Sequence, residues 1–187
     1  QNIIPVIDIS PLRDGTNPKA VARELHAASQ GLGFIYIKGH GIPEAVIKSA
    51  RANALEFFAL PEATKSAVKV SEKHRGWLGQ GGAKMKDGAK ADLKESFIWG
   101  HQDADGKTLE DHPLRGANQW PDHLPAMQAQ AMAYFNHAHD VAHHLMRGFA
   151  LGLDLEQDFF LKSASRPMSR ASYVYYPAQP SDMGEGK

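Results

Sequence analysis

The sequence predicts an α+β fold, on three observations. Short segments rich in β-branched and aromatic residues, typical of strands, are scattered among segments whose apolar residues recur at helical spacing. One helical stripe, over residues 124–152, is far longer than the others. We count only about four strand segments, and the last of them ends near the end of the chain, so they cannot close a sheet alone. Either a small α+β domain is complete here, or the chain stops where its main sheet begins.

The first elements are a strand and a helix. Residues 3–9 are mostly apolar and contain Pro5, which predicts a short edge strand. Asn17 is a suitable cap for a helix whose first residue is Pro18, because proline is favoured in the first turn. The apolar residues of this helix lie one turn apart: Val21, Leu25, Ala28 and Leu32.

The middle of the chain predicts a second strand, two helices and a loop. Residues 33–38 are rich in aromatic and β-branched side chains, and a Gly-His-Gly turn follows them. Pro43 opens a helix that ends near Pro61, where a shorter helix through Lys65 begins. Residues 71–94 are rich in glycine and predict a long loop, which in compact domains is often functional.

The remaining elements alternate between sheet, loop and helix. Residues 94–100 predict a strand, and the polar stretch 102–118 predicts a loop. The main helix covers residues 124–152, and a final strand over 172–176 stops at Pro177.

Composition excludes several classes of protein. The chain has 187 residues, 42% of them hydrophobic, and its 21 Lys and Arg balance 21 Asp and Glu, so nucleic-acid binding through phosphates is not expected. Cysteine is absent, which excludes disulfides and thiolate metal sites. No apolar run approaches the ~20 residues of a membrane span. We therefore expect a cytoplasmic protein that binds neither nucleic acid nor membranes.

Two histidine pairs imitate metal-binding motifs. His139 and His143 lie one helical turn apart with an acid after the first, as in zinc proteases, but at ~140° from Met127 they should face water. A catalytic zinc site also requires Glu at the position of Asp140 and a third ligand, so we expect solvated side chains there. A zinc protein using this helix remains a weaker alternative.

The second pair, His101 and Asp103, has the His-x-Asp spacing of a facial iron triad. It precedes a predicted turn rather than lying on a rigid strand, so we expect ordinary surface residues. His40, between two glycines, is expected to hydrogen-bond within its turn and not to bind a metal.

Four residues are candidates for ligand contacts. Arg75 and Trp77, at the mouth of the glycine-rich loop, could hold a carboxylate and stack on an apolar body, although a packed lid explains them equally well. Ser172 and Tyr176 share one face of the last strand with Val174, because side chains alternate along a strand. Tyr176 could therefore direct its phenol at a ligand carboxylate, the alternative being a tyrosine buried in the core.

A series of motifs supports a family resemblance. In order, the series is Ile4-Pro5-Val6-Ile7-Asp8-Ile9-Ser10, Gly33-Phe34-Ile35-Tyr36-Ile37, His40-Gly41-Ile42-Pro43, Phe57-Phe58-Ala59-Leu60-Pro61, Arg75-Gly76-Trp77, Asp92-Leu93-Lys94-Glu95-Ser96-Phe97, Trp120-Pro121, Ala150-Leu151-Gly152-Leu153 and Tyr175-Tyr176-Pro177. Together these motifs resemble the N-terminal region of the isopenicillin N synthase-like Fe(II)- and 2-oxoglutarate-dependent dioxygenases.

The resemblance implies a cofactor set and a reaction. Such enzymes hold Fe(II) in a double-stranded β-helix, or jelly roll, through His-x-Asp and a distant His, and an Arg-x-Ser grips 2-oxoglutarate. With dioxygen they oxidise a small-molecule substrate by hydroxylation, desaturation or cyclisation. The resemblance implies that Tyr176 contacts 2-oxoglutarate and, by position, that Arg75 and Trp77 lie on the substrate side, with Ser172 a further candidate there.

The resemblance also implies how the chain is organised. It is expected to be a single or partial domain, with a helix-rich region over 1–165 and the first strand of the barrel core over 166–187. The iron ligands are expected beyond Lys187, so the barrel is expected to be truncated and the chain inactive alone. The competing hypothesis is a non-catalytic helical binding module.

Overall fold

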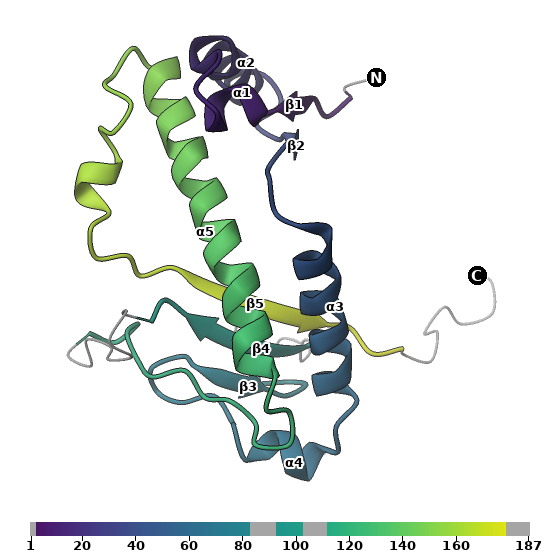
Figure 1. Cartoon of the computed structure of the whole chain (residues 1–187). Helices are drawn as coiled ribbons and strands as arrows, with labels where there is room; N and C mark the ends of the chain where they lie inside the picture. Colours follow the sequence, from purple (N-terminus) through teal and green to yellow (C-terminus); the bar gives the residue numbers. More distant parts are fainter. Residues whose placement is uncertain (1–2, 83–92, 103–111, 179–187) are drawn as a thin grey trace, which may run out of the picture. The chain divides into compact units, whose positions relative to one another are not determined.

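The computed structural model describes residues 3–82, 93–102 and 112–178 (Figure 1). Its elements are β1 (Val6–Asp8), α1 (Ser10–Arg13), α2 (Pro18–Gln30), β2 (Tyr36–Lys38), α3 (Glu44–Phe58), α4 (Glu62–Ser66), β3 (Gly76–Leu78), β4 (Glu95–Gly100), α5 (Met127–Gly152), a 3-10 turn η1 (Leu161–Ser163) and β5 (Arg170–Tyr175). The prediction of an α+β fold is confirmed. No helix in these ranges is long and apolar enough to span a membrane.

The chain folds as two compact units, each built from two stretches of sequence. The first unit comprises Gln1–Ala50 and Ala129–Pro167, and the second comprises Arg51–Gln128 and Met168–Lys187. Both α3 and α5 therefore contribute residues to each unit.

The first unit has a small parallel sheet beside helices. β1 and β2 pair in parallel, with Ile7 opposite Ile37 (Figure 1). The core of this unit contains buried apolar side chains from β1, α1, α2, α5 and the residue between β1 and α1: Ile7, Ile9, Leu12, Val21, Leu25 and Val141. The Asn17 side chain accepts a hydrogen bond from the Ala20 N–H at 3.3 Å, which confirms the predicted cap of α2.

The second unit contains the sheet on which the candidate site lies. Its three strands are antiparallel in the order β3-β4-β5 (Figure 1). β4 is buried along nearly all its length, as expected for a central strand. One face packs on a cluster of aromatic rings contributed by Phe57, Phe97, Trp99 and Trp120. These rings give the sheet one buried face.

The structure corrects the prediction that residues 71–94 are all loop. β3 lies within that range and pairs with β4, placing Trp77 opposite Phe97. It escaped prediction because it is only three residues long and begins at a glycine. Gly76 has φ +112°, and a Cβ there would lie 2.4 Å from the Val68 carbonyl oxygen, so the strand requires glycine at this position.

Candidate functional site

The last strand exposes one row of side chains. Exposed and half-buried residues alternate along β5, and this confirms that Ser172 and Val174 share a face. Tyr176 follows the strand directly and continues this row, with 68% of its surface exposed. The phenol of Tyr176 makes no hydrogen bond to any part of the chain that the structure describes.

The opposite row of β5 anchors the strand to the core. The Tyr173 ring lies 4.4 Å from the Trp99 ring, measured between centroids. The Tyr175 ring stacks on Phe58 at a centroid distance of 5.2 Å, with the ring planes 14° apart. Tyr176 therefore extends from a residue whose own side chain is held by an aromatic stack.

Arg75 is buried and bound to backbone carbonyls. Its side chain is 2% exposed, and its Nη1 donates to the carbonyl oxygens of Lys73 and His74 at 3.4 and 3.2 Å. Its Nη2 donates to the Leu114 carbonyl oxygen at 3.0 Å, while its Nε has no hydrogen-bond partner within the described ranges. These bonds tie the segment before β3 to the segment around Leu114.

A second guanidinium lies at the same end of the sheet. A Cβ on Gly100 would lie 2.3 Å from Arg75 Nη2, and Gly100 pairs in register with Arg170. Burial lowers the pKa of the Arg75 guanidinium, and the positive charge of Arg170 lowers that pKa further. Arg75 is therefore a buried cation with a second positive charge nearby.

The candidate residues do not form one cluster. Arg170 and Tyr176 are six residue steps apart, and at about 3.3 Å per step they are separated by about 20 Å along the strand. Arg75 thus lies at the Arg170 end, whereas Tyr176 lies beyond the other end, where Tyr175 pairs with Glu95. Ser172, whose hydroxyl donates to the Tyr173 carbonyl oxygen at 3.2 Å, lies between them.

Trp77 belongs to a buried ionic cluster. Its Nε1 donates to Glu95 Oε2 at 2.8 Å, and the Lys65 ammonium lies 5.3 Å from the centroid of its ring. Lys65 Nζ also lies 2.7 Å from Glu95 Oε2 and donates to the Phe58 carbonyl oxygen at 3.2 Å. Both charged residues are buried, at 6% and 8% exposure for Lys65 and Glu95. Sequence reasoning missed this pair, because no local pattern distinguishes a buried lysine from an exposed one.

The histidines of α5 are not solvated as expected. His139 and His143 are half-buried, with ring centroids 4.4 Å apart, and His139 stacks on the buried Phe135. Residues four apart on a helix lie in one row, so His139 and His143 continue the row of the buried Phe135. Over the ranges that the structure describes, no group of three or more His, Cys, Asp or Glu could hold a metal ion.

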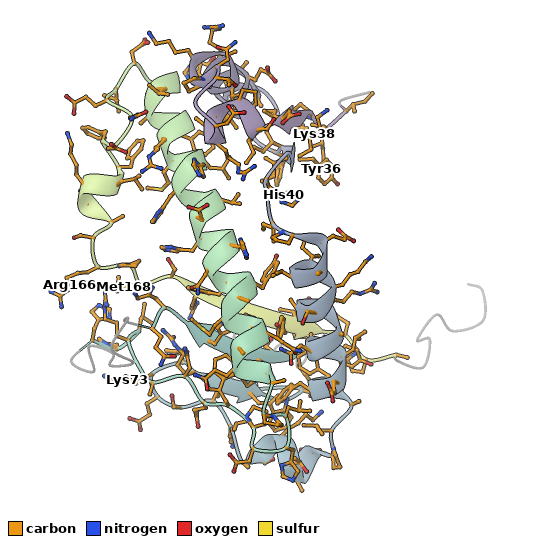
Figure 2. All side chains as sticks on the ribbon, viewed as in Figure 1. Tyr36, Lys38, His40, Lys73, Arg166 and Met168 are labelled. Carbon is orange, nitrogen blue, oxygen red and sulfur yellow. The ribbon has the colours of Figure 1, made fainter. Side chains whose placement is uncertain are left out.

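The two other histidines considered as metal ligands, His40 and His101, take part in hydrogen bonds with the backbone. Figure 2 labels His40, which follows β2. Its Nδ1 accepts a hydrogen bond from the Ile42 N–H at 3.0 Å, which confirms its predicted role in this turn. The backbone N–H of His101 donates to the Ser169 carbonyl oxygen at 2.8 Å, joining the strand ends. Asp103, its predicted partner in the His-x-Asp motif, lies outside the described residues.

The sequence matches a known family and several curated proteins. The N-terminal family model of the non-haem dioxygenases in morphine synthesis matches residues 4–123. The chain is 28% identical to the 2-oxoglutarate-Fe(II) type oxidoreductase hxnY of Emericella nidulans over 97% of this chain and 54% of that protein. It is 30% identical to isopenicillin N synthase of a Flavobacterium species over 93% of this chain and 56% of that protein. The chain thus spans about half the length of the curated relatives it matches.

Solved structures agree with these relatives. A 2OG-Fe(II) oxygenase family protein from Caulobacter crescentus superposes with a TM-score of 0.85 at 27% identity, covering 98% of this chain and 59% of the other. A full-length Neurospora crassa protein, solved in complex with alpha-KG, superposes with a TM-score of 0.78 at 26% identity. The match covers 95% of this chain and 55% of that protein. These comparisons support neither a non-catalytic binding module nor a zinc protein. The chain therefore belongs to the 2-oxoglutarate- and Fe(II)-dependent dioxygenase family, as its motifs predicted.

Proposed function

We propose that the whole protein containing this chain oxidises a small molecule with dioxygen, Fe(II) and 2-oxoglutarate. The observation that carries the proposal is the family match over residues 4–123 together with the superposition on a 2OG-Fe(II) oxygenase family protein. Hydroxylation, desaturation and cyclisation are the reactions we expect, on a substrate that enters beside the sheet of the second unit.

In this proposal the chain is the helical N-terminal part of a double-stranded β-helix enzyme, and β5 is the first strand of its barrel. The exposed row of β5 then faces the barrel interior, where its side chains meet ligands. Tyr176 donates its phenol hydrogen to a carboxylate of 2-oxoglutarate. Support comes from its 68% exposure and from a hydroxyl without a hydrogen-bond partner among the residues described.

The iron ligands are proposed to lie outside this chain. The described residues offer no cluster of three His, Cys, Asp or Glu, so they do not fit an iron site by themselves. We therefore propose that residues 1–187 alone are inactive, and we assign no reaction step through iron to any residue of the chain.

The substrate side is proposed to lie at the Arg75 end of the sheet. Arg170, an exposed residue at this end of β5, is the charge that an anionic group of the substrate could reach, because Arg75 is buried and donates to three carbonyl oxygens. Trp77 does not offer its indole N–H to a substrate, because that group is already bound to Glu95, which pairs with Tyr175 at the opposite end of the sheet. Ser172, between the two ends, is the candidate for a neutral hydrogen bond to substrate.

The test is cosubstrate turnover by the whole protein. Purified protein is incubated with 2-oxoglutarate, Fe(II) and dioxygen, with and without a panel of small acids and amines, and succinate is measured. We expect Fe(II)-dependent succinate that rises when a true substrate is added and falls to background with a chelator. Failure to bind 2-oxoglutarate in the presence of metal would contradict the proposal.

A further inference from the structure

The end of β5 is joined to a buried ion pair by a closed series of contacts. We propose that Lys65 and Glu95 are positioning residues, which hold the end of β5 so that Tyr176 is aligned for 2-oxoglutarate. This inference rests on the proposed function, because it assumes that Tyr176 binds the cosubstrate. It adds to that function two residues that touch neither substrate nor cofactor.

The contacts form a circuit around Tyr175. Lys65 Nζ donates to the carbonyl oxygen of Phe58, and the ring of Phe58 stacks on the ring of Tyr175. Tyr175 is paired in register with Glu95, and Glu95 Oε2 lies 2.7 Å from Lys65 Nζ. The backbone and the ring of Tyr175 are therefore both held by groups that the ion pair joins.

Tyr176 depends on this circuit because its own phenol has no hydrogen-bond partner among the residues that the structure describes. It lies one residue beyond the last residue of β5, and its side chain is mostly exposed. Displacement or rotation of Tyr175 would therefore carry the Tyr176 phenol with it. A hydrogen bond to a carboxylate weakens steeply when the donor is misdirected, so such a displacement should weaken 2-oxoglutarate binding.

The energetics of the pair also favour a positioning role. Two buried charges lose their hydration, and replacing a buried ion pair by neutral residues of similar volume is often neutral or stabilising. Stability alone is thus a weak reason for placing a lysine and a glutamate here. A fixed geometry is a better reason, because the pair has four directed contacts, to Phe58, Trp77 and one another.

The main test removes the charges and keeps the packing. In the whole protein, Lys65→Met and Glu95→Gln are combined, since glutamine still accepts the Trp77 N–H. Binding of 2-oxoglutarate is measured by calorimetry with Mn(II), which supports binding without turnover, and the unfolding midpoint is measured in parallel. We expect binding to weaken about tenfold, the scale typical of lost orienting contacts, with the unfolding midpoint nearly unchanged. Wild-type affinity in the folded double variant would overturn the inference.

A matched control carries the same substitutions at an exposed pair. Lys48 Nζ lies 3.5 Å from Glu44 Oε1 on α3, and both side chains are more than 70% exposed, at 74% and 71%. Lys48→Met with Glu44→Gln makes the identical chemical change at an exposed pair of the first unit. We expect its 2-oxoglutarate affinity to equal that of the wild type; an equal loss in this control would overturn the positioning role.

A double-mutant cycle separates positioning from general damage. Tyr176→Phe removes the phenol, and we expect it to weaken 2-oxoglutarate binding by itself. If Lys65 and Glu95 act through Tyr176, the charge-removing double variant causes no further weakening in the Tyr176→Phe background. Equal weakening in both backgrounds would overturn the inference while leaving the role of Tyr176 intact. Wild-type binding by Tyr176→Phe would instead refute that role, and the inference with it.

A second variant covers the case in which the double variant does not fold. Phe58→Leu removes the ring stacked on Tyr175 without changing any charge. We expect the same loss of 2-oxoglutarate affinity, again absent in the Tyr176→Phe background. A folded Phe58→Leu protein that binds 2-oxoglutarate as tightly as the wild type would overturn the inference.

Discussion

The rings of Phe58 and Tyr175 stack with their centroids 5.2 Å apart and their planes 14° apart. This contact links the end of α3 to the strand that leads to Tyr176. The carbonyl of the same Phe58 accepts a hydrogen bond from the buried Lys65 ammonium. One residue therefore connects the aromatic packing of the sheet to its internal ion pair.

Breaking that ion pair on one side should cost more than removing both charges. Lys65→Met leaves the Glu95 carboxylate buried without its cation, and we expect a loss of about 3–5 kcal/mol in the free energy of unfolding. Adding Glu95→Gln should recover most of this loss. Urea denaturation of the three proteins measures both effects. A double variant no more stable than Lys65→Met would show that the charge is not the cause.

Glycine should matter more at Gly76 than at Gly148. A Cβ at Gly76 would lie 2.4 Å from a backbone oxygen at φ +112°, whereas a Cβ at Gly148 would meet the ends of the Leu12 and Leu25 side chains. We expect Gly76→Ala to destabilise the protein by at least about 2 kcal/mol, because backbone atoms cannot give way. Thermal unfolding compares the two variants. Equal midpoints would contradict the geometry around β3.

Removing the N-cap of α2 should cost less stability than the changes at Lys65 and Gly76. Asn17→Ala removes the acceptor for the Ala20 N–H and should cost about 1 kcal/mol. Asn17→Ser is the matched control, since its hydroxyl oxygen can accept the same bond. Chemical denaturation should rank the wild type and Asn17→Ser above Asn17→Ala. Equal stability of all three would mean that water replaces the cap without cost.

Stability should fall in mildly acidic solution through His144. Burial lowers the pKa of His144 below its ordinary 6.5, with Arg147, Arg13 and His143 also lowering it and Asp140 raising it. The folded protein then binds fewer protons than the unfolded chain. The contribution of His144 to the free energy of unfolding is therefore complete above pH 6.5 and is lost as pH falls towards the pKa of His144 in the folded protein. His144→Gln should flatten this part of the profile of unfolding free energy against pH. An unchanged profile would exclude His144 as the cause.

Local patterns predicted the parts of the fold that depend on neighbouring residues. Asn17 followed by Pro18 located the start of α2, and alternation along β5 placed Ser172 on its exposed row. Residues whose environment depends on distant segments were not predictable in this way. The burial of Lys65 requires Glu95, thirty positions away.

The same distinction applies to the candidate site. Arg75 was a candidate because arginine binds carboxylates, and its three bonds to carbonyl oxygens were not visible in the sequence. Tyr176 was a candidate from strand alternation and from the family resemblance, and it lies in an exposed position. The separation of these two residues towards opposite ends of the sheet follows only from the register of β4 and β5.

The most direct test of the account is Fe(II)-dependent conversion of 2-oxoglutarate to succinate by the whole protein, compared between the wild type and Tyr176→Phe. We expect the wild type to form succinate and Tyr176→Phe to require a higher concentration of 2-oxoglutarate for the same rate. An absence of succinate from folded, iron-loaded wild type across the substrate panel, together with an absence of 2-oxoglutarate binding, would contradict it.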